Sequence, residues 1–113
     1  MLVVDDDRSL RTLSRVILEI EGFEVREAAT LEEAESALAE TRPAAVLLDV
    51  HLGPAATDAL FARLRADGIP VAAVTGTADL AEVAGRADAT LMKPFEPGAL
   101  VEITRRLVKV SGA

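Results

Sequence analysis

Residues 2–7 read Leu2-Val3-Val4-Asp5-Asp6-Asp7, a short apolar run that leads directly into three aspartates. The same arrangement recurs over residues 44–49, where five apolar residues precede Asp49. Short apolar runs separated by amphipathic segments are typical of parallel strands that are buried on both faces. The sequence therefore predicts an α/β fold in which acidic residues follow the strands.

Two further apolar runs end at polar side chains of a different kind. Residues 69–74 lead to Thr75, and residues 89–92 lead to Lys93 and a proline. In an open parallel sheet the carboxyl ends of the strands lie along one edge, where ligands bind. We therefore expect carboxylates, a hydroxyl group and an ammonium group to converge on one small crevice.

The segments between these runs carry apolar residues at helical spacing. They predict helices over residues 9–21, 31–40, 58–66, 79–86 and 98–110. Thr30 followed by Glu33 is a capping-box pattern, and Gly53-Pro54 indicates a loop over residues 51–57. Residues 23–28 alternate apolar and charged side chains, which predicts an edge strand. Strands alternating with helices imply a parallel sheet with helices on both faces.

Length and composition narrow the class of protein. The 113 residues suit one domain spanning residues 1–113, and the net charge of -7 argues against nucleic acid as a direct partner. The absence of cysteine excludes disulfides and thiolate metal sites. No apolar stretch approaches the ~20 residues of a membrane span, and the aspartates at the start interrupt any signal peptide. We therefore expect a cytoplasmic protein without a membrane partner.

The aspartates indicate a metal site. Carboxylates held a few ångströms apart repel strongly unless a cation lies among them. Mg²⁺ typically binds one or two carboxylates together with water and phosphate oxygens, so Asp5, Asp6 and Asp49 are candidate ligands. The alternative is that the aspartate run only caps the first helix, and this simpler interpretation is favoured for Asp7.

The other residues of the crevice suit phosphoryl chemistry. Asp49 can act as a nucleophile toward phosphorus and form an acyl phosphate. Lys93 can pair with a carboxylate or a phosphoryl oxygen, and the Lys93-Pro94 step is a candidate cis peptide. Thr75 can donate one hydrogen bond to a phosphoryl oxygen, although for Thr75 taken alone the simpler interpretation, a threonine that satisfies loop backbone groups, is favoured.

Four segments together resemble the receiver domain of two-component response regulators. They are Val3 to Asp7, Leu47 to Asp49, Val74 to Gly76, and Lys93 to Phe95. The resemblance covers nearly the whole chain. It implies a flavodoxin-like, doubly wound (βα)₅ fold whose five-stranded parallel sheet has the order 2-1-3-4-5.

The resemblance also implies a function in a phosphorelay. Asp49 would be phosphorylated by a phosphohistidine on a sensor histidine kinase or phosphotransfer protein. Mg²⁺ would be bound by Asp6, Asp49 and the backbone carbonyl of His51, with Asp5 acting mainly through water. The domain would catalyse only its own phosphorylation and later hydrolysis, and would not be a turnover enzyme.

Phosphorylation is expected to switch one face of the domain. Lys93 and Thr75 would contact the phosphoryl group, and drawing Thr75 inward would shift the following loop. The predicted helix at 79–86, the strand at 89–92 and the last helix form the expected output face. Thr90 stands where the family usually has Tyr or Phe, so a different output geometry is expected.

Two other interpretations remain open. One is a receiver-like interaction module that is never phosphorylated. Thr90 and the short stretch after Thr75 favour this alternative. The other is an aspartate-nucleophile phosphohydrolase of the haloacid-dehalogenase type, which residues 5–9 match only loosely because Ser9 replaces threonine. A dinucleotide-binding site is excluded because no Gly-x-Gly-x-x-Gly follows the first strand.

Overall fold

The computed structural model describes residues 1–76, 83 and 85–111. Its five strands form one parallel sheet with the order β2-β1-β3-β4-β5. The strands are β1 (Leu2–Val4), β2 (Arg26–Ala28), β3 (Val46–Asp49), β4 (Val71–Thr75) and β5 (Ala89–Met92). The predicted fold class and strand order are therefore confirmed.

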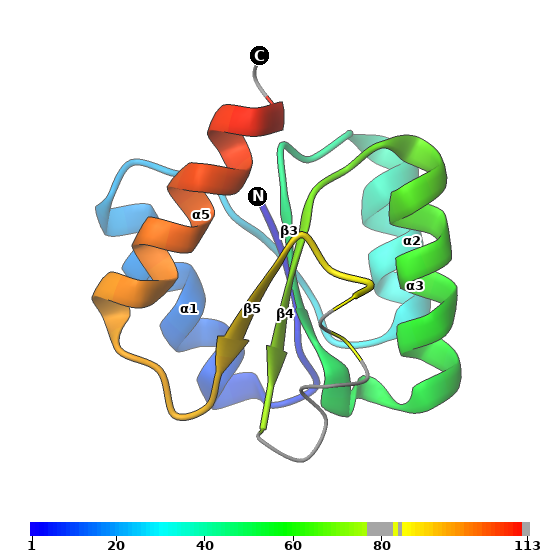
Figure 1. Ribbon diagram of the computed structural model, residues 1–113, viewed down its shortest axis with the longest axis horizontal. Helices are drawn as coiled ribbons and strands as arrows, with labels where there is room; N and C mark the ends of the chain where they lie inside the picture. Colours follow the sequence, from blue (N-terminus) through cyan, green and yellow to red (C-terminus); the bar gives the residue numbers. More distant parts are fainter. Residues whose placement is uncertain (77–82, 84, 112–113) are drawn as a thin grey trace.

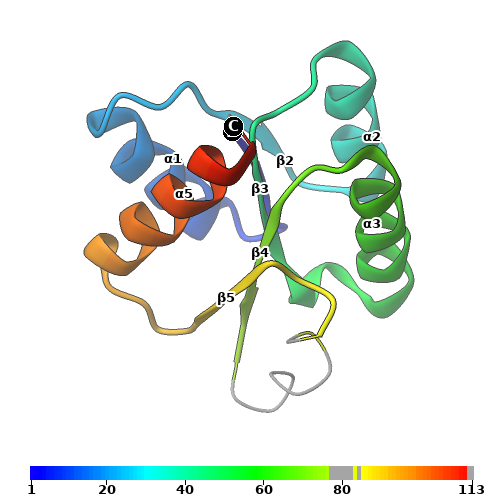
Figure 2. The same ribbon diagram turned by 45° about the horizontal axis from the view of Figure 1, so that its top comes forward.

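Helices cover both faces of the sheet. The described helices are α1 (Arg8–Ile20), α2 (Leu31–Glu40), α3 (Pro54–Asp67) and α5 (Pro97–Ser111), with a 3₁₀ turn η1 (Val50–Leu52) after β3. Helices α1 and α5 lie on one face, and α2 and α3 lie on the other (Figures 1 and 2). Within the described ranges, no helix is long and apolar enough to cross a lipid bilayer.

The alternation of side chains along each strand divides the core into two halves. Leu2 and Val4 of β1 lie in the core formed with α2 and α3. Val3, between them, lies in the second core with Leu18 of α1 and Leu100 of α5. Because successive strand residues point to opposite faces, both faces are fully used for apolar packing. In β1, β3 and β4 the polar side chains therefore stand only at or just after the strand end, whereas the outer strands β2 and β5 also carry polar residues within the strand.

Capping side chains fix the starts of two helices. Asp7 Oδ1 accepts a hydrogen bond from the Leu10 amide at 3.1 Å, so the simple capping interpretation of Asp7 is confirmed. Thr30 Oγ1 accepts from the Glu33 amide at 3.1 Å, and the Glu33 carboxylate accepts from the Ala29 amide at 2.8 Å. The Thr30 half of the predicted capping box is therefore confirmed, while the Glu33 carboxylate binds the amide one residue before the cap.

The predicted loop over residues 51–57 is wrong. Residues 50–52 form η1, and α3 already begins at Pro54. Gly53, with φ 117°, makes the turn, and the fixed φ of proline suits the first helical position. Proline was interpreted as a break although it begins the helix.

Two other elements differ from expectation. The edge strand predicted over residues 23–28 is reduced to β2, because its only neighbour, β1, pairs with no more than these three residues. The predicted helix over residues 79–86 lies largely outside the described residues. Within it, Gly85 and Arg86 lie in a turn, and the Arg86 amide donates to the Val83 carbonyl at 3.0 Å.

Two buried threonines give a matched test of core polarity. The hydroxyl of Thr104 in α5 is fully buried and has no hydrogen-bond partner in the described structure. Thr104→Val should therefore raise the free energy of unfolding by about 1 kcal/mol, because an unsatisfied hydroxyl is removed at similar volume. Thr57 donates to the Val50 carbonyl at 3.3 Å, so Thr57→Val should lower it by a similar amount. Urea unfolding at neutral pH measures both, and equal effects of the two substitutions would contradict this account.

Candidate functional site

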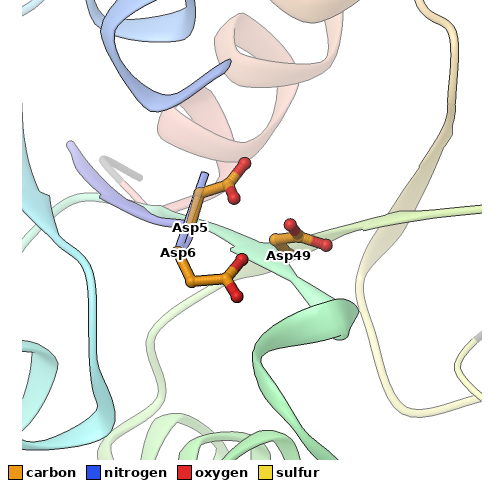
Figure 3. Close-up of side chains that lie close together, drawn as sticks. All are labelled: Asp5, Asp6 and Asp49. Carbon is orange, nitrogen blue, oxygen red and sulfur yellow. The ribbon is translucent and has the colours of Figure 1, made fainter. Parts of the chain in front are cut away.

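Three carboxylates meet at the carboxyl edge of the sheet. Asp5 and Asp6 follow β1, and Asp49 is the last residue of β3. The register aligns Val4 with Leu48, which brings the ends of these two strands side by side. One oxygen of each carboxylate lies within 4.8 Å of the others (Figure 3). The convergence predicted from the sequence is confirmed for these three residues.

The cluster is buried on one side and open on the other. Asp5 and Asp49 are 4% and 2% exposed, whereas Asp6 is exposed. Two anions in a partly dry site are costly unless hydrogen bonds, protons or cations compensate them. Asp6 therefore marks the side from which a cation or substrate can enter.

Lys93 supplies one of these compensating contacts. Its Nζ lies 3.1 Å from Asp49 Oδ2, and its side chain is largely buried. The backbone fixes its position, because the Lys93 amide donates to the Thr75 carbonyl at 2.9 Å. The Lys93-Pro94 peptide is cis, as the sequence suggested. The strand ends therefore bring together an ammonium group and the acidic cluster, as predicted.

Thr75 and His51 each make a hydrogen bond that involves a backbone group. Thr75 is fully buried, and its hydroxyl donates to the Gly76 carbonyl at 3.0 Å. The simpler interpretation, a threonine that satisfies the loop backbone, therefore describes this conformation. The His51 side chain is exposed, while its amide donates to Asp49 Oδ1 at 3.0 Å. Both oxygens of Asp49 thus accept a hydrogen bond.

Burial and hydrogen bonding separate the two buried carboxyls by pKa. Burial, together with a hydrogen bond to Asp49, raises the pKa of Asp5 to about 7. Burial also acts to raise the pKa of Asp49, but hydrogen bonds from Asp5, the His51 amide and Lys93 outweigh it, so its pKa lies below the ordinary value. In the metal-free protein the proton shared by this pair is therefore assigned to Asp5, and Asp49 is the anion.

Sequence reasoning missed a residue that positions the cluster. Arg11 of α1 donates from Nη1 to the main-chain carbonyl of Asp5 at 2.8 Å, and its Nε pairs with Glu27 of β2 at 2.9 Å. This guanidinium joins α1 and β2 to the end of β1. No local signal could have identified it, because Arg11 and Glu27 are sixteen residues apart.

The pKa of Asp5 makes the stability of the metal-free protein depend on pH. Folding raises this pKa from 3.8 to about 7, so the contribution is complete below pH 3.8 and is lost as pH rises through 7. Between these values the free energy of unfolding should fall by at most ~1.4 kcal/mol per pH unit. The lowered pKa of Asp49 acts only at more acidic pH.

Urea unfolding in a chelating buffer at pH 5.5 and 7.5 tests this. The parent should be more stable at pH 5.5, and Asp5→Asn should remove most of the difference. Asp7→Asn should keep the difference in stability between the two pH values, because Asp7 lies outside the cluster. A parent protein that is more stable at pH 7.5 would contradict the assignment.

Comparison with known proteins agrees with this geometry. Residues 1–105 match the family described as response regulator receiver domain. The DNA-binding response regulator MtrA of Mycobacterium tuberculosis is 37% identical over 110 residues, covering 93% of this chain and 48% of MtrA. The phosphate regulon regulatory protein PhoB of Pseudomonas aeruginosa is 28% identical over 120 residues, covering 99% and 52%. The chain spans about half the length of these curated relatives.

The prediction that it does not contact nucleic acid directly stays a prediction, since MtrA is named as DNA-binding.

Solved structures are similar over nearly the whole chain. The receiver domain of NtrX from Brucella abortus has a TM-score of 0.84 and 27% identity, covering 96% of this chain and 97% of that one. A CheY-like receiver domain protein from Methanospirillum hungatei has a TM-score of 0.84 and 30% identity, covering 98% and 94%. The sheet order, the acidic cluster and the family match lead to one conclusion: the chain belongs to the receiver domains of response regulators, the phosphoacceptor domains of two-component signalling.

Proposed function

We propose that Asp49 is the phosphoacceptor of this domain and takes a phosphoryl group from a phosphohistidine in a Mg²⁺-dependent reaction. The main support is the contact between Asp49 and Lys93 at 3.1 Å, beside two further carboxylates. The donor is a sensor histidine kinase or a phosphotransfer protein. Residues 1–113 act as a single receiver domain.

The donor atoms of the cluster fit a hard divalent cation. Three carboxylates lie within 4.8 Å of one another, and two of them are buried. Asp6, Asp49 and the backbone carbonyl of His51 would hold Mg²⁺, with Asp5 acting through water. When bound, the ion supplies positive charge to the phosphoryl oxygens.

The chain's own residues perform the transfer by position and charge. An ionised oxygen of Asp49 attacks phosphorus, an O–P bond forms, and the P–N bond to the donor histidine breaks with its electron pair returning to the imidazole nitrogen. Lys93 is held against Asp49 and is placed to neutralise the transferred group, which is where phosphoryl transfer needs most help. The domain catalyses only this step and the later hydrolysis of its own acyl phosphate.

The switch is proposed to begin at Thr75. Its hydroxyl donates to the Gly76 carbonyl in this conformation. In the phosphorylated protein it exchanges this acceptor for a phosphoryl oxygen, and the loop after Thr75 follows. The affected face comprises residues 79–86, β5 and α5. Thr90 of β5 cannot supply the aromatic side chain that the family usually has there, so the output geometry differs from that of the family.

Phosphorylation by a small phosphodonor tests the central proposal. Incubation with acetyl phosphate and Mg²⁺ should add one phosphate to the parent, as measured by intact mass. Asp49→Asn should add none, because the nucleophilic oxygen is lost. Asp7→Asn is the matched control, since Asp7 caps α1 outside the cluster and should be labelled like the parent. An unlabelled parent, or a labelled Asp49→Asn variant, would reject the proposal.

Lys93 gives a second test. Lys93→Ala should slow phosphorylation on the order of 100-fold, because a preorganised charge that acts on the transferred group is removed. The affinity of the Lys93→Ala variant for Mg²⁺ should not weaken, because in the parent the Lys93 ammonium competes with the ion for Asp49. Lys109→Ala in α5, an exposed lysine outside the cluster, should leave the rate unchanged. Equal rates of phosphorylation in the Lys93→Ala variant and the parent would contradict the role of Lys93 in the transfer.

A further inference from the structure

The Asp6 carboxylate is the least supported part of the acidic cluster. Asp5 and Asp49 are buried, and each accepts a hydrogen bond from a backbone amide, at 2.9 and 3.0 Å. Asp6 is exposed, and its carboxylate takes part in none of the hydrogen bonds and ion pairs found among the described residues. It nevertheless points toward the other two carboxylates (Figure 3). The position of this carboxylate therefore depends on the backbone that carries it.

The backbone between β1 and α1 is held on both sides of Asp5. The Asp5 amide donates to the Ala28 carbonyl of β2 at 3.0 Å, and the Asp5 carbonyl accepts from Arg11 Nη1 at 2.8 Å. That carbonyl belongs to the peptide bond that joins Asp5 to Asp6. Because a peptide unit is planar, fixing its carbonyl also fixes the direction in which the chain enters Asp6. Arg11 is therefore the side chain that orients the backbone of Asp6.

Arg11 is itself held in place by an ionic network. Its Nε lies 2.9 Å from one carboxylate oxygen of Glu27, and the other oxygen lies 2.7 Å from Arg15 Nε. The side chains of Arg11 and Glu27 are only 15% and 27% exposed, so solvent screens their attraction less than that of a fully exposed pair. The planar guanidinium reaches Glu27 and the Asp5 carbonyl at once, which makes it a rigid link between β2 and the end of β1.

We propose that Arg11 is a positioning residue for Mg²⁺, which holds Asp6 in the direction needed for binding without touching the ion. The inference rests on the proposed function, in which Asp6 and Asp49 hold Mg²⁺. Loss of a group that orients a metal ligand typically weakens metal binding by about 10- to 100-fold. Charge alone has the opposite effect, because removing a cation near the site favours the binding of another cation. The sign of the change in affinity therefore separates positioning from electrostatics.

Stability measured as a function of Mg²⁺ concentration tests the proposal. The rise in the free energy of unfolding with Mg²⁺, compared with sodium chloride at equal ionic strength, gives the dissociation constant of the folded protein. Arg11→Met should raise this constant at least about tenfold, because the orientation of Asp6 is lost. Arg15→Met is the matched control. It removes the same charge and the other partner of Glu27 but leaves the bond from Arg11 to Asp5, so it should not weaken Mg²⁺ binding.

Arg11→Lys tests whether the guanidinium fork itself is needed. Lysine keeps the positive charge and most of the packing, but its single ammonium group does not replace the two directed bonds of the guanidinium. This variant should therefore bind Mg²⁺ about as weakly as Arg11→Met, and it provides the measurement if Arg11→Met does not fold. A lysine variant with the affinity of the parent would show that Arg11 contributes charge or packing, and would overturn the proposal.

The Mg²⁺ dependence of phosphorylation gives a readout that a general structural defect would not reproduce. With acetyl phosphate as donor, Arg11→Met should need at least about tenfold more Mg²⁺ to reach half of its maximal rate. At saturating Mg²⁺ it should phosphorylate as fast as the parent, because the transfer itself uses Asp49 and Lys93. Lys93→Ala should stay slow at saturating Mg²⁺. A maximal rate that falls in Arg11→Met while its Mg²⁺ requirement is unchanged would contradict a role in positioning the metal ligand.

The outcomes separate this inference from the proposed function. If the parent binds Mg²⁺ and is phosphorylated, but Arg11→Met binds Mg²⁺ as tightly as the parent or more tightly, the role of Arg11 is overturned and Asp49 remains the phosphoacceptor. A parent whose stability does not respond to Mg²⁺ overturns both the metal site and the role of Arg11.

Discussion

The repulsion between Asp5 and Asp49 is the constraint around which this domain is organised. Both carboxyls are buried, and one oxygen of each lies within 4.8 Å of the other. The fold tolerates them because Lys93 and the His51 amide bind Asp49, while the Asp7 amide donates to Asp5 at 2.9 Å. Burial and the neighbouring Asp49 raise the pKa of Asp5 to about 7, whereas the contacts of Asp49 lower its own pKa. A site that is stabilised in this way is prepared for a cation and for a group carrying negative charge.

The sheet explains why these groups meet where they do. The three central strands, β1, β3 and β4, use both faces for apolar packing, one against α1 and α5 and the other against α2 and α3. In these three strands only the residue at or just after the strand end is polar, and parallel strands place those residues along one edge. The chemistry of the domain is thus a consequence of the packing that makes the sheet stable. Arg11 adds a link from α1 to the same edge, so this helix also supports the acidic cluster.

The inner and outer sides of α1 differ in what they contact. Its inner side joins the core through Leu18, and Arg11 anchors the end of β1. Its outer side presents Leu13, Val16 and Ile20 to solvent. Both begin from the same cap at Asp7, which fixes where the helix starts beside the cluster.

The sequence by itself determined the strands, the order of the sheet through its resemblance to receiver domains, and the meeting of Asp5, Asp6, Asp49 and Lys93. Strong patterns of apolar residues, with polar residues at their ends, are local information that any stable fold must respect. The start of α3 at Pro54 was misread, because proline ends one element and begins another equally well. Only the tertiary structure decided that Thr75 bonds to its own loop, that Arg11 holds Asp5, and which carboxyl keeps its proton. The Thr75 and Arg11 contacts depend on how the chain turns after β4 and β1, and the pKa of Asp5 depends on Asp49 and Lys93, which are far from it in the chain.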